Sequence, residues 1–113
     1  MERKFGQLKL IDLQKIIDSC TEKWSNINLT EVNECVVRLG ILEGEFHWHK
    51  HNEEDEFFFV VDGELILELE NESITLLPNQ GFTVPCKTFH RTRAEKKTIV
   101  LMVEKRTVNP RGD

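Results

Sequence analysis

The sequence predicts an all-β domain, an antiparallel sandwich or barrel, preceded by a short helical extension. After Trp24, stretches of about five to seven residues rich in Val, Ile, Leu and Phe alternate with turn residues. Within residues 35–41 and 64–70, apolar and other side chains alternate, which is typical of strands with one buried face. Because no helical pattern separates these stretches, the strands are expected to pair antiparallel.

The N-terminal region contains the best helix candidate, within residues 8–24. Asp12 can serve as N-cap because its carboxylate can accept a hydrogen bond from the first helical turn. The apolar residues that follow recur at helical spacing and form one face, made of Leu13, Ile16, Ile17 and Cys20. We therefore expect a short amphipathic helix that packs against the domain.

The strands are expected, in chain order, at residues 35–41, 57–61, 64–70, 74–77, 82–84 and 98–103. Asp62-Gly63 lies between the second and third of these, and this dipeptide suits a type I′ turn with positive φ at both positions. The sequence therefore predicts a hairpin there. We expect an N-terminal extension over residues 1–30, a barrel over 31–106 and a loose C-terminal tail over 107–113.

Composition excludes some function classes. The chain has 113 residues, a formal net charge of −5 and a pI of about 5.4. Such a charge repels phosphate backbones, so we expect no nucleic-acid partner. No apolar run approaches the roughly 20 residues that span a bilayer, so no membrane partner is expected. Three widely spaced cysteines and a charge-rich N-terminal stretch indicate reduced thiols and a cytoplasmic location.

Residues 47–51 read HWHKH and place three histidines at alternate positions. On a strand, alternate side chains share a face, and two of them, with Cα atoms roughly 6.6 Å apart, can bind one ion. A third would lie too far along the row. The spacing leaves two pairs open, His47 with His49 or His49 with His51.

Further ligands must come from other segments. Glu56 lies where the acidic turn NEEDE enters a strand, and its side chain can face back toward the histidines. The remaining histidine, His90, follows a strand and a turn in the stretch PCKTFH. An antiparallel fold can return this stretch to the same pocket, so both residues are candidate metal ligands.

The run His49-x-His51-x4-Glu56-x6-Gly63 resembles the first conserved motif of the cupin superfamily. Pro85-x-Lys87-x-x-His90 resembles the second. The resemblance covers residues 32–104 and implies a small antiparallel cupin β-barrel, also called a double-stranded β-helix or jelly roll. It also implies one divalent transition metal per subunit, held by His49, His51, Glu56 and His90.

Three positions depart from the motifs: two of the departures concern turns, and the third concerns the end of the second motif. The first motif's leading glycine is expected at Glu43, whereas the chain has Gly44, one residue later. The second motif usually has glycine at the position of Lys87, and it ends in an asparagine where this chain has Ala94. These departures predict altered loop geometry with an intact ligand set.

Three imidazoles and a carboxylate suit Fe, Mn, Ni, Zn or Cu. The wider pattern is similar to small cupins labelled mannose-6-phosphate isomerase-like. We expect a small-molecule enzyme, a dioxygenase, sugar isomerase or decarboxylase, and the absence of tyrosine disfavours an epimerase. The alternative is a non-catalytic module that binds or senses a sugar-like metabolite. The pocket is expected to be lined by His47, Phe58, Phe82 and Met102.

A homodimer is expected as well. Small cupins commonly pair their barrels through edge strands, and residues 35–41 carry apolar side chains on both faces.

Overall fold

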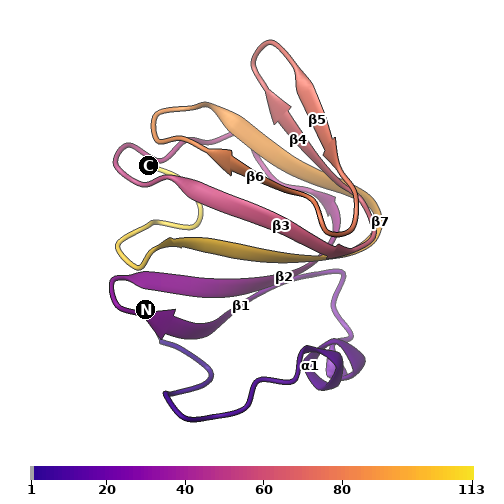
Figure 1. Ribbon diagram of the computed structural model, residues 1–113. Helices are drawn as coiled ribbons and strands as arrows, with labels where there is room; N and C mark the ends of the chain where they lie inside the picture. The colour runs from indigo at the N-terminus through magenta and orange to yellow at the C-terminus, as the bar shows by residue number, and fades with distance from the viewer. Residues whose placement is uncertain (1) are drawn as a thin grey trace.

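The computed structural model describes residues 2–113 and confirms the all-β prediction. One short helix precedes seven strands within these residues (Figure 1). The helix is α1 (Leu13–Ser19), and the strands are β1 (Trp24–Val32), β2 (Cys35–Glu45), β3 (Glu56–Asp62), β4 (Leu65–Leu69), β5 (Ser73–Leu76), β6 (Gly81–Val84) and β7 (His90–Lys105).

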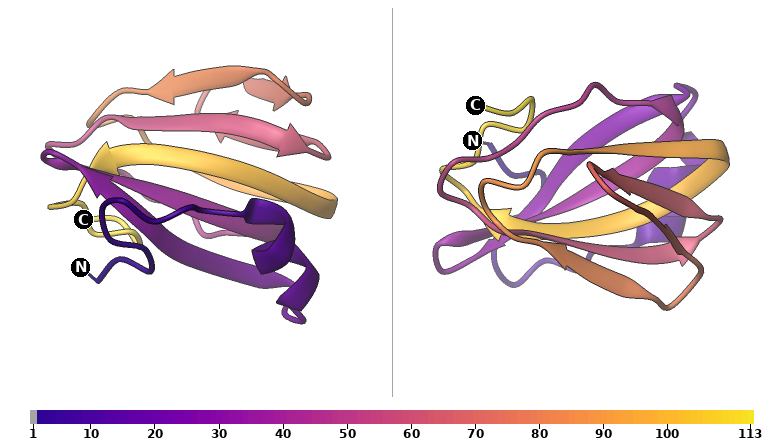
Figure 2. Two further views of the ribbon diagram at one scale, coloured as in Figure 1. Left: turned by 60° about the horizontal axis from the view of Figure 1, so that its bottom comes forward. Right: turned by 90° about the horizontal axis from the view of Figure 1, so that it is seen from above.

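All strand pairs are antiparallel. Hydrogen bonds join the strands in the order β1-β2-β7-β3-β6, while β4 pairs with β5 and with β7. The long β7 takes part in both layers, because its start pairs with β4 and its end pairs with β2 and β3. Figure 2 shows this strand curving across the molecule from one layer into the other. The result is a sandwich closed at one side by a single bent strand.

The helix lies within the predicted region and begins at the predicted cap. The Asp12 carboxylate accepts a hydrogen bond of 3.3 Å from the backbone N–H of Lys15. Cys20 has extended backbone angles and ends the helix after two turns. The described residues contain no helix long and apolar enough to cross a membrane.

Two apolar clusters stabilise the fold. The inner cluster lies between the layers and includes Phe58, Val60, Leu67 and Val100. The outer cluster lies between β2 and the N-terminal segment, where Ile16 of α1 packs with residues that include Leu39 and Ile41. In Figures 1 and 2, α1 lies outside the sheet next to β1 and β2.

The two clusters explain why both faces of β2 are buried. We interpreted this pattern as burial in a dimer, but the chain's own N-terminal segment covers the outer face. The side chains that alternate along the strand divide accordingly. Leu39 and Ile41 point outward to the helix, whereas Leu42 belongs to the inner cluster.

The predicted Asp62-Gly63 hairpin is wrong. β3 pairs with β6 and β7, and β4 pairs with β5 and β7, so the two strands flanking this dipeptide do not pair with each other. Of the two turn residues, Gly63 alone has positive φ, +86°. A Cβ at Gly63 would lie 2.5 Å from Thr98 Oγ1, so the glycine permits close passage over β7 as the chain changes layers.

The last strand begins earlier than predicted, at His90 instead of Thr98. Its first residues alternate in burial, with His90, Thr92 and Ala94 inside. The alternating outer positions carry Arg91 and Arg93, which both pair with Glu68 of β4 at 3.0 and 2.7 Å. The first residues of β7 are therefore held in the sheet by ion pairs. They lack the apolar alternation from which a strand is predicted.

β1 pairs with β2 from Trp24 to Val32, so the expected boundary between residues 30 and 31 falls inside a strand of the sheet.

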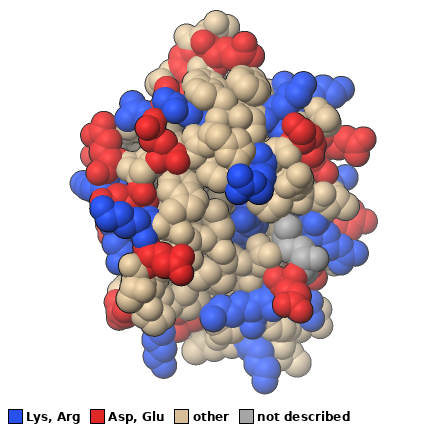
Figure 3. Space-filling model, turned by 180° about the vertical axis from the view of Figure 1, so that it is seen from behind, with Lys and Arg blue, Asp and Glu red and all other residues tan. Residues whose placement is uncertain are grey.

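On the face shown in Figure 3, acidic and basic side chains are interspersed. The absence of a nucleic-acid partner stays a prediction.

Candidate metal centre

The histidine segment is held beside the start of β7 by backbone hydrogen bonds. The N–H of His49 donates to the carbonyl of His90 at 2.9 Å, and the N–H of His90 donates to the carbonyl of His49 at 2.8 Å. Lys87 donates its N–H to the carbonyl of His51 at 2.6 Å. Glu56 begins β3, next to this pair of segments. Three separate parts of the chain therefore meet at one point.

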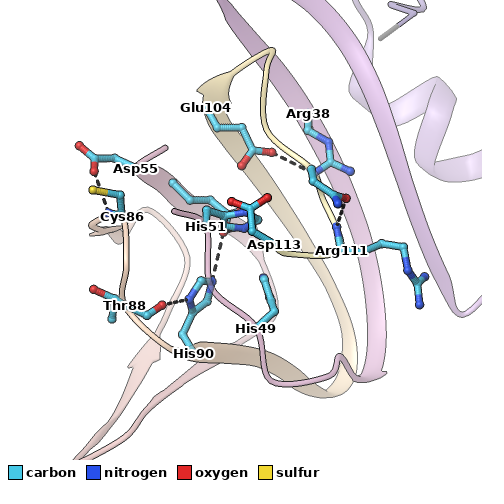
Figure 4. Close-up of polar contacts among 12 residues, drawn as sticks. Arg38, His49, His51, Asp55, Cys86, Thr88, His90, Glu104, Arg111 and Asp113 are labelled. Carbon is cyan, nitrogen blue, oxygen red and sulfur yellow. Dashed lines mark hydrogen bonds and ion pairs between the residues drawn. The ribbon is translucent and has the colours of Figure 1, made fainter. Parts of the chain in front are cut away.

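The structure brings together the four ligands that the motif resemblance implied. His49, His51, Glu56 and His90 are all buried, and one potential ligand atom from each lies within 4.8 Å of the others. Glu56 Oε1 is 3.2 Å from His90 Nε2 and 3.4 Å from His51 Nε2. Figure 4 shows the histidines converging from the segments that carry them.

Backbone carbonyls fix the orientation of two imidazoles. Nδ1 of His49 donates to the carbonyl of His47 at 2.9 Å, and Nδ1 of His90 donates to the carbonyl of Thr88 at 2.8 Å. With Nδ1 protonated, the lone pair of each ring lies on Nε2. Both histidines are therefore held in the tautomer that binds a metal through Nε2.

His51 provides the test of whether these residues fit a metal. Its ring is buried, and neither ring nitrogen makes a hydrogen bond within the described residues. Buried polar atoms are nearly always partnered, and a divalent ion at the point shared by the four side chains would supply the partner. Imidazole nitrogens and one carboxylate are ligands of first-row transition metals, so the residues fit.

Electrostatics act differently on the individual ligands of the metal-free site. Burial lowers the pKa of His49 to about 4, so this imidazole is neutral at pH 7. Burial opposes ionisation of Glu56, but the adjacent imidazoles of His51 and His90 outweigh it and hold the pKa of Glu56 well below its usual range. For His51, burial is likewise outweighed by Glu56, which raises the pKa of the imidazole.

A second buried carboxyl group lies beside the ligands. Glu104 of β7 is directly opposite Glu56 of β3, and it accepts a hydrogen bond of 2.9 Å from Nη1 of Arg38. Burial, followed by the charge of Glu56, raises the pKa of Glu104 to about 8. Arg38 lies on β2 and is 6% exposed. Glu104 therefore lies between the ligand Glu56 and a buried guanidinium. Figure 4 shows Glu104 beside Arg38.

A crevice of about 30 Å³ adjoins the ligands. Four residues were expected to line the pocket, and two of them, Phe58 and Met102, line this crevice. Phe82 packs against the inner cluster instead, and His47 is exposed, with Nε2 2.6 Å from the carbonyl oxygen of Arg111. The complete lining is Trp24, Asn26, Arg38, Leu42, Phe46, His49, Glu56, Phe58, Thr92, Met102 and Pro110.

The C-terminal residues pack over the histidine segment. Val108 is buried, and the N–H of Asp113 donates to the carbonyl of Lys50 at 2.9 Å. The carboxylate of Asp113 accepts a hydrogen bond of 2.6 Å from the N–H of Asn52. A Cβ at Gly112 would lie 2.5 Å from Cβ of His49. The expected loose tail is therefore a strap across the metal end of the barrel.

The sequence profile of the Cupin domain family matches residues 35–104. The chain belongs to the cupin family. An uncharacterized protein of Bacillus subtilis, YdbB, is 38% identical over 97 residues, which cover 85% of this cupin and 86% of YdbB.

Solved structures agree. A cupin-2 domain containing protein from Shewanella frigidimarina has a TM-score of 0.82 and 29% identity, covering 88% of this cupin and 98% of that chain. KdgF from Halomonas sp. has a TM-score of 0.68 and 23% identity, covering 77% and 83%, which shows a shared fold alone.

The two departures from the cupin motifs leave the turns intact. Lys87 adopts φ +66°, the left-handed conformation for which the motif usually supplies glycine. Gly44 has φ +119° next to an irregularity in the pairing of β2 with β7. The turn before His90 is thus kept with a lysine in place of glycine.

Sequence reasoning missed several residues of the crevice, above all Trp24 and Arg38, and it also missed Glu104, which pairs with Arg38. One available signal was a lone arginine within the apolar run CVVRLGIL. A charge at the centre of a buried strand is costly unless it is paired, so its presence indicates a buried partner or a ligand.

Proposed function

We propose that this cupin is a small-molecule enzyme that uses a divalent metal bound by His49, His51, Glu56 and His90. One observation carries the proposal. Four buried ligand atoms converge within 4.8 Å beside a crevice lined by both apolar and polar side chains. Structural metal sites are closed on all sides, whereas catalytic sites keep a position for substrate.

The ligand set supports several reaction classes. A metal bound there would supply Lewis acidity, and Fe, Ni or Cu would add redox chemistry. The apolar wall formed by Phe58, Leu42 and Met102 suits a dioxygenase, which needs an enclosed pocket. A sugar isomerase of the mannose-6-phosphate type is the other enzymatic candidate, and it needs space for a phosphosugar.

The strap favours a second candidate, a non-catalytic metal-dependent binding module. Pro110 lines the crevice and Gly112 lies against His49, so the C-terminal residues restrict access to the metal end. A site used only to bind a metabolite or to stabilise the fold has no need for rapid exchange. The state of the metal's remaining coordination positions separates the two candidates.

The first experiment is elemental analysis of untagged protein purified without chelator. We expect about one equivalent of transition metal, and loss of most of it in His49→Ala and in Glu56→Ala. His47→Ala is the matched control, because this exposed neighbour lies outside the ligand group. Full metal content in both ligand variants would refute the site.

The second experiment tests for catalysis. Cobalt-substituted protein whose visible spectrum changes with azide has an open coordination position, as an enzyme requires. Oxygen-uptake assays with catechols, flavonols and diketones then test for a dioxygenase, and phosphosugar assays test for an isomerase. A spectrum insensitive to azide, with no turnover, would favour the binding module.

We also propose a cytoplasmic homodimer. The three cysteines form no disulfide within residues 2–113, which is consistent with a reducing compartment. Leu8 and Leu10, in the segment before α1, are 103% and 89% exposed, and a second copy could cover them. Light scattering after size exclusion gives the mass; a monomer at micromolar concentration would refute the dimer.

A further inference from the structure

Two hydrogen-bond donors in the crevice lack acceptors. Nε1 of Trp24 is buried and has no hydrogen-bond partner among residues 2–113. An indole N–H can only donate, so neither rotation nor a change of protonation can satisfy it. Buried unpartnered donors are rare, and one that lines a crevice indicates that an acceptor enters from outside the chain.

Arg38 is the second donor. Its Nε donates to Oδ1 of Asn28 at 3.0 Å, and its Nη1 donates to Glu104 at 2.9 Å. A guanidinium has five N–H groups in one plane, and the two hydrogen bonds that Arg38 makes use Nε and Nη1. Nη2 takes part in neither of them and is left to bind a further acceptor. Asn28 and Glu104 hold the plane of the group from two sides. Arg38 is therefore fixed in orientation with donors to spare.

The surroundings determine which acceptor fits. Apolar and aromatic side chains form the rest of the wall, where Trp24 stacks on Phe46 with ring centroids 5.7 Å apart. With a divalent ion present, its charge and that of Arg38 exceed the charges of Glu56 and Glu104. An anion is thus favoured, and a planar carboxylate matches the guanidinium fork.

Size narrows the choice further. A space of about 30 Å³ holds a group the size of a few water molecules. A carboxylate has three heavy atoms and fits such a space. The remainder of a larger ligand would have to extend along the apolar wall.

We propose that Arg38 and Trp24 form a carboxylate-binding subsite beside the metal ligands, which makes a small carboxylic acid the substrate class. This inference rests on the proposed function, because it assigns the substrate of the same site. Arg38 determines specificity by charge and geometry. Trp24 adds one directed hydrogen bond and part of the apolar wall.

The test uses malonate as the probe and malonamide as its neutral isostere. Trp48→Phe leaves Trp24 as the single tryptophan of the chain, so intrinsic fluorescence reports on the crevice. Trp48 stacks on Phe89, and neither residue lines the crevice. We expect malonate to change the fluorescence of the zinc-loaded protein and to bind at least about tenfold more tightly than malonamide.

Arg38→Met keeps an unbranched stem out to the ε position and removes the guanidinium with its donors. We expect it to weaken malonate binding roughly 10- to 100-fold by calorimetry, the range for a hydrogen bond to a charged group. Trp24→Phe keeps the aromatic wall and should weaken binding by a few-fold. The half-exposed Arg106→Met is the matched control and should leave the affinity unchanged. Equal malonate affinity in Arg38→Met and the parent would overturn the proposal.

Two further measurements cover other outcomes. If Arg38→Met does not fold, the unmutated protein without metal is tested instead. It keeps Arg38 and lacks the ion, so it shows whether Arg38 binds the carboxylate by itself. If the metal-free protein still binds malonate more tightly than malonamide, the subsite is supported. If that preference is lost without metal, the ion alone binds the anion, and the proposal is overturned. Absence of metal in the purified protein would refute the proposed function, whereas this metal-free comparison would still test the subsite.

Discussion

The two faces of β2 differ in what their side chains do. On the outer face, Leu39 and Ile41 pack in an apolar cluster with residues of α1 and its flanking segment. On the inner face, Arg38 is nearly as well buried but faces Glu104 and a crevice. One strand thus separates a face that only stabilises the fold from a face that keeps charges and unpartnered donors in place. A burial pattern alone does not distinguish the two.

Leu39→Ala gives the strongest separation of the faces. Leu39 is fully buried in the outer cluster, so truncation should cost about 2–5 kcal/mol of unfolding free energy. Metal content of the folded protein should stay unchanged, because no ligand contacts that cluster. Denaturant unfolding and elemental analysis measure the two quantities. Leu77→Ala is the control, since Leu77 is 44% exposed and should lose less than about 0.5 kcal/mol.

Shortening the chain to end at Val108 tests whether the strap restricts access to the metal site on the inner face. It removes the strap over His49 and keeps the buried Val108 in place. We expect a chelator to extract the metal roughly tenfold faster, a change of about 1.4 kcal/mol in the barrier. Metal stoichiometry before extraction should not change. An unaltered extraction rate would show that the strap does not limit access.

Glu104→Gln tests the buried charge of the inner face in metal-free protein. Glutamate ionises near pH 4.5 in the unfolded chain, but burial raises the pKa of Glu104 to about 8 in the folded state. Between these values the folded state binds more protons, so stability falls as the pH rises. The variant lacks this loss, and its stability relative to the parent should rise from pH 5 to pH 8. Parallel pH profiles would contradict the assignment.

Asp12→Ala changes the helix on the outer side and should have the smallest effect on the free energy of unfolding. The hydrogen bond from Lys15 N–H to the Asp12 carboxylate is long, 3.3 Å, so its loss should cost about 0.5–1 kcal/mol. Chemical denaturation measures the change, and metal binding should not respond. A loss above about 2 kcal/mol would mean that Asp12 does more than cap the helix.

The sequence predicted features that depend on nearby residues. Alternation along residues 35–41 and 64–70 predicted strands, and Asp12 with the apolar positions after it predicted α1. His49, His51 and Glu56 lie within one short stretch, so motif spacing sufficed to group them. His90 was a candidate as the remaining histidine of the chain, and the resemblance to cupins then placed it in the ligand set, because nothing local links it to the other ligands.

Features that depend on distant partners were not predictable. Asp62-Gly63 has the composition of a hairpin turn, but β3 and β4 find their partners in β6, β7 and β5. The start of β7 is polar and is a strand because Glu68 pairs with its arginines. The free donors of Arg38 and Trp24 are properties of packing. A sequence lists donors without showing which of them lack acceptors.

The strap also affects how the protein can be handled. Asp113 bonds to Asn52 and Lys50 through its side chain and backbone, so a fusion joined after Asp113 starts beside the histidine segment. A polyhistidine tag there would place extra imidazoles within reach of the same ion. It would change the apparent stoichiometry and affinity for nickel or zinc. An affinity tag attached before the N-terminal segment and then cleaved leaves that end of the barrel undisturbed.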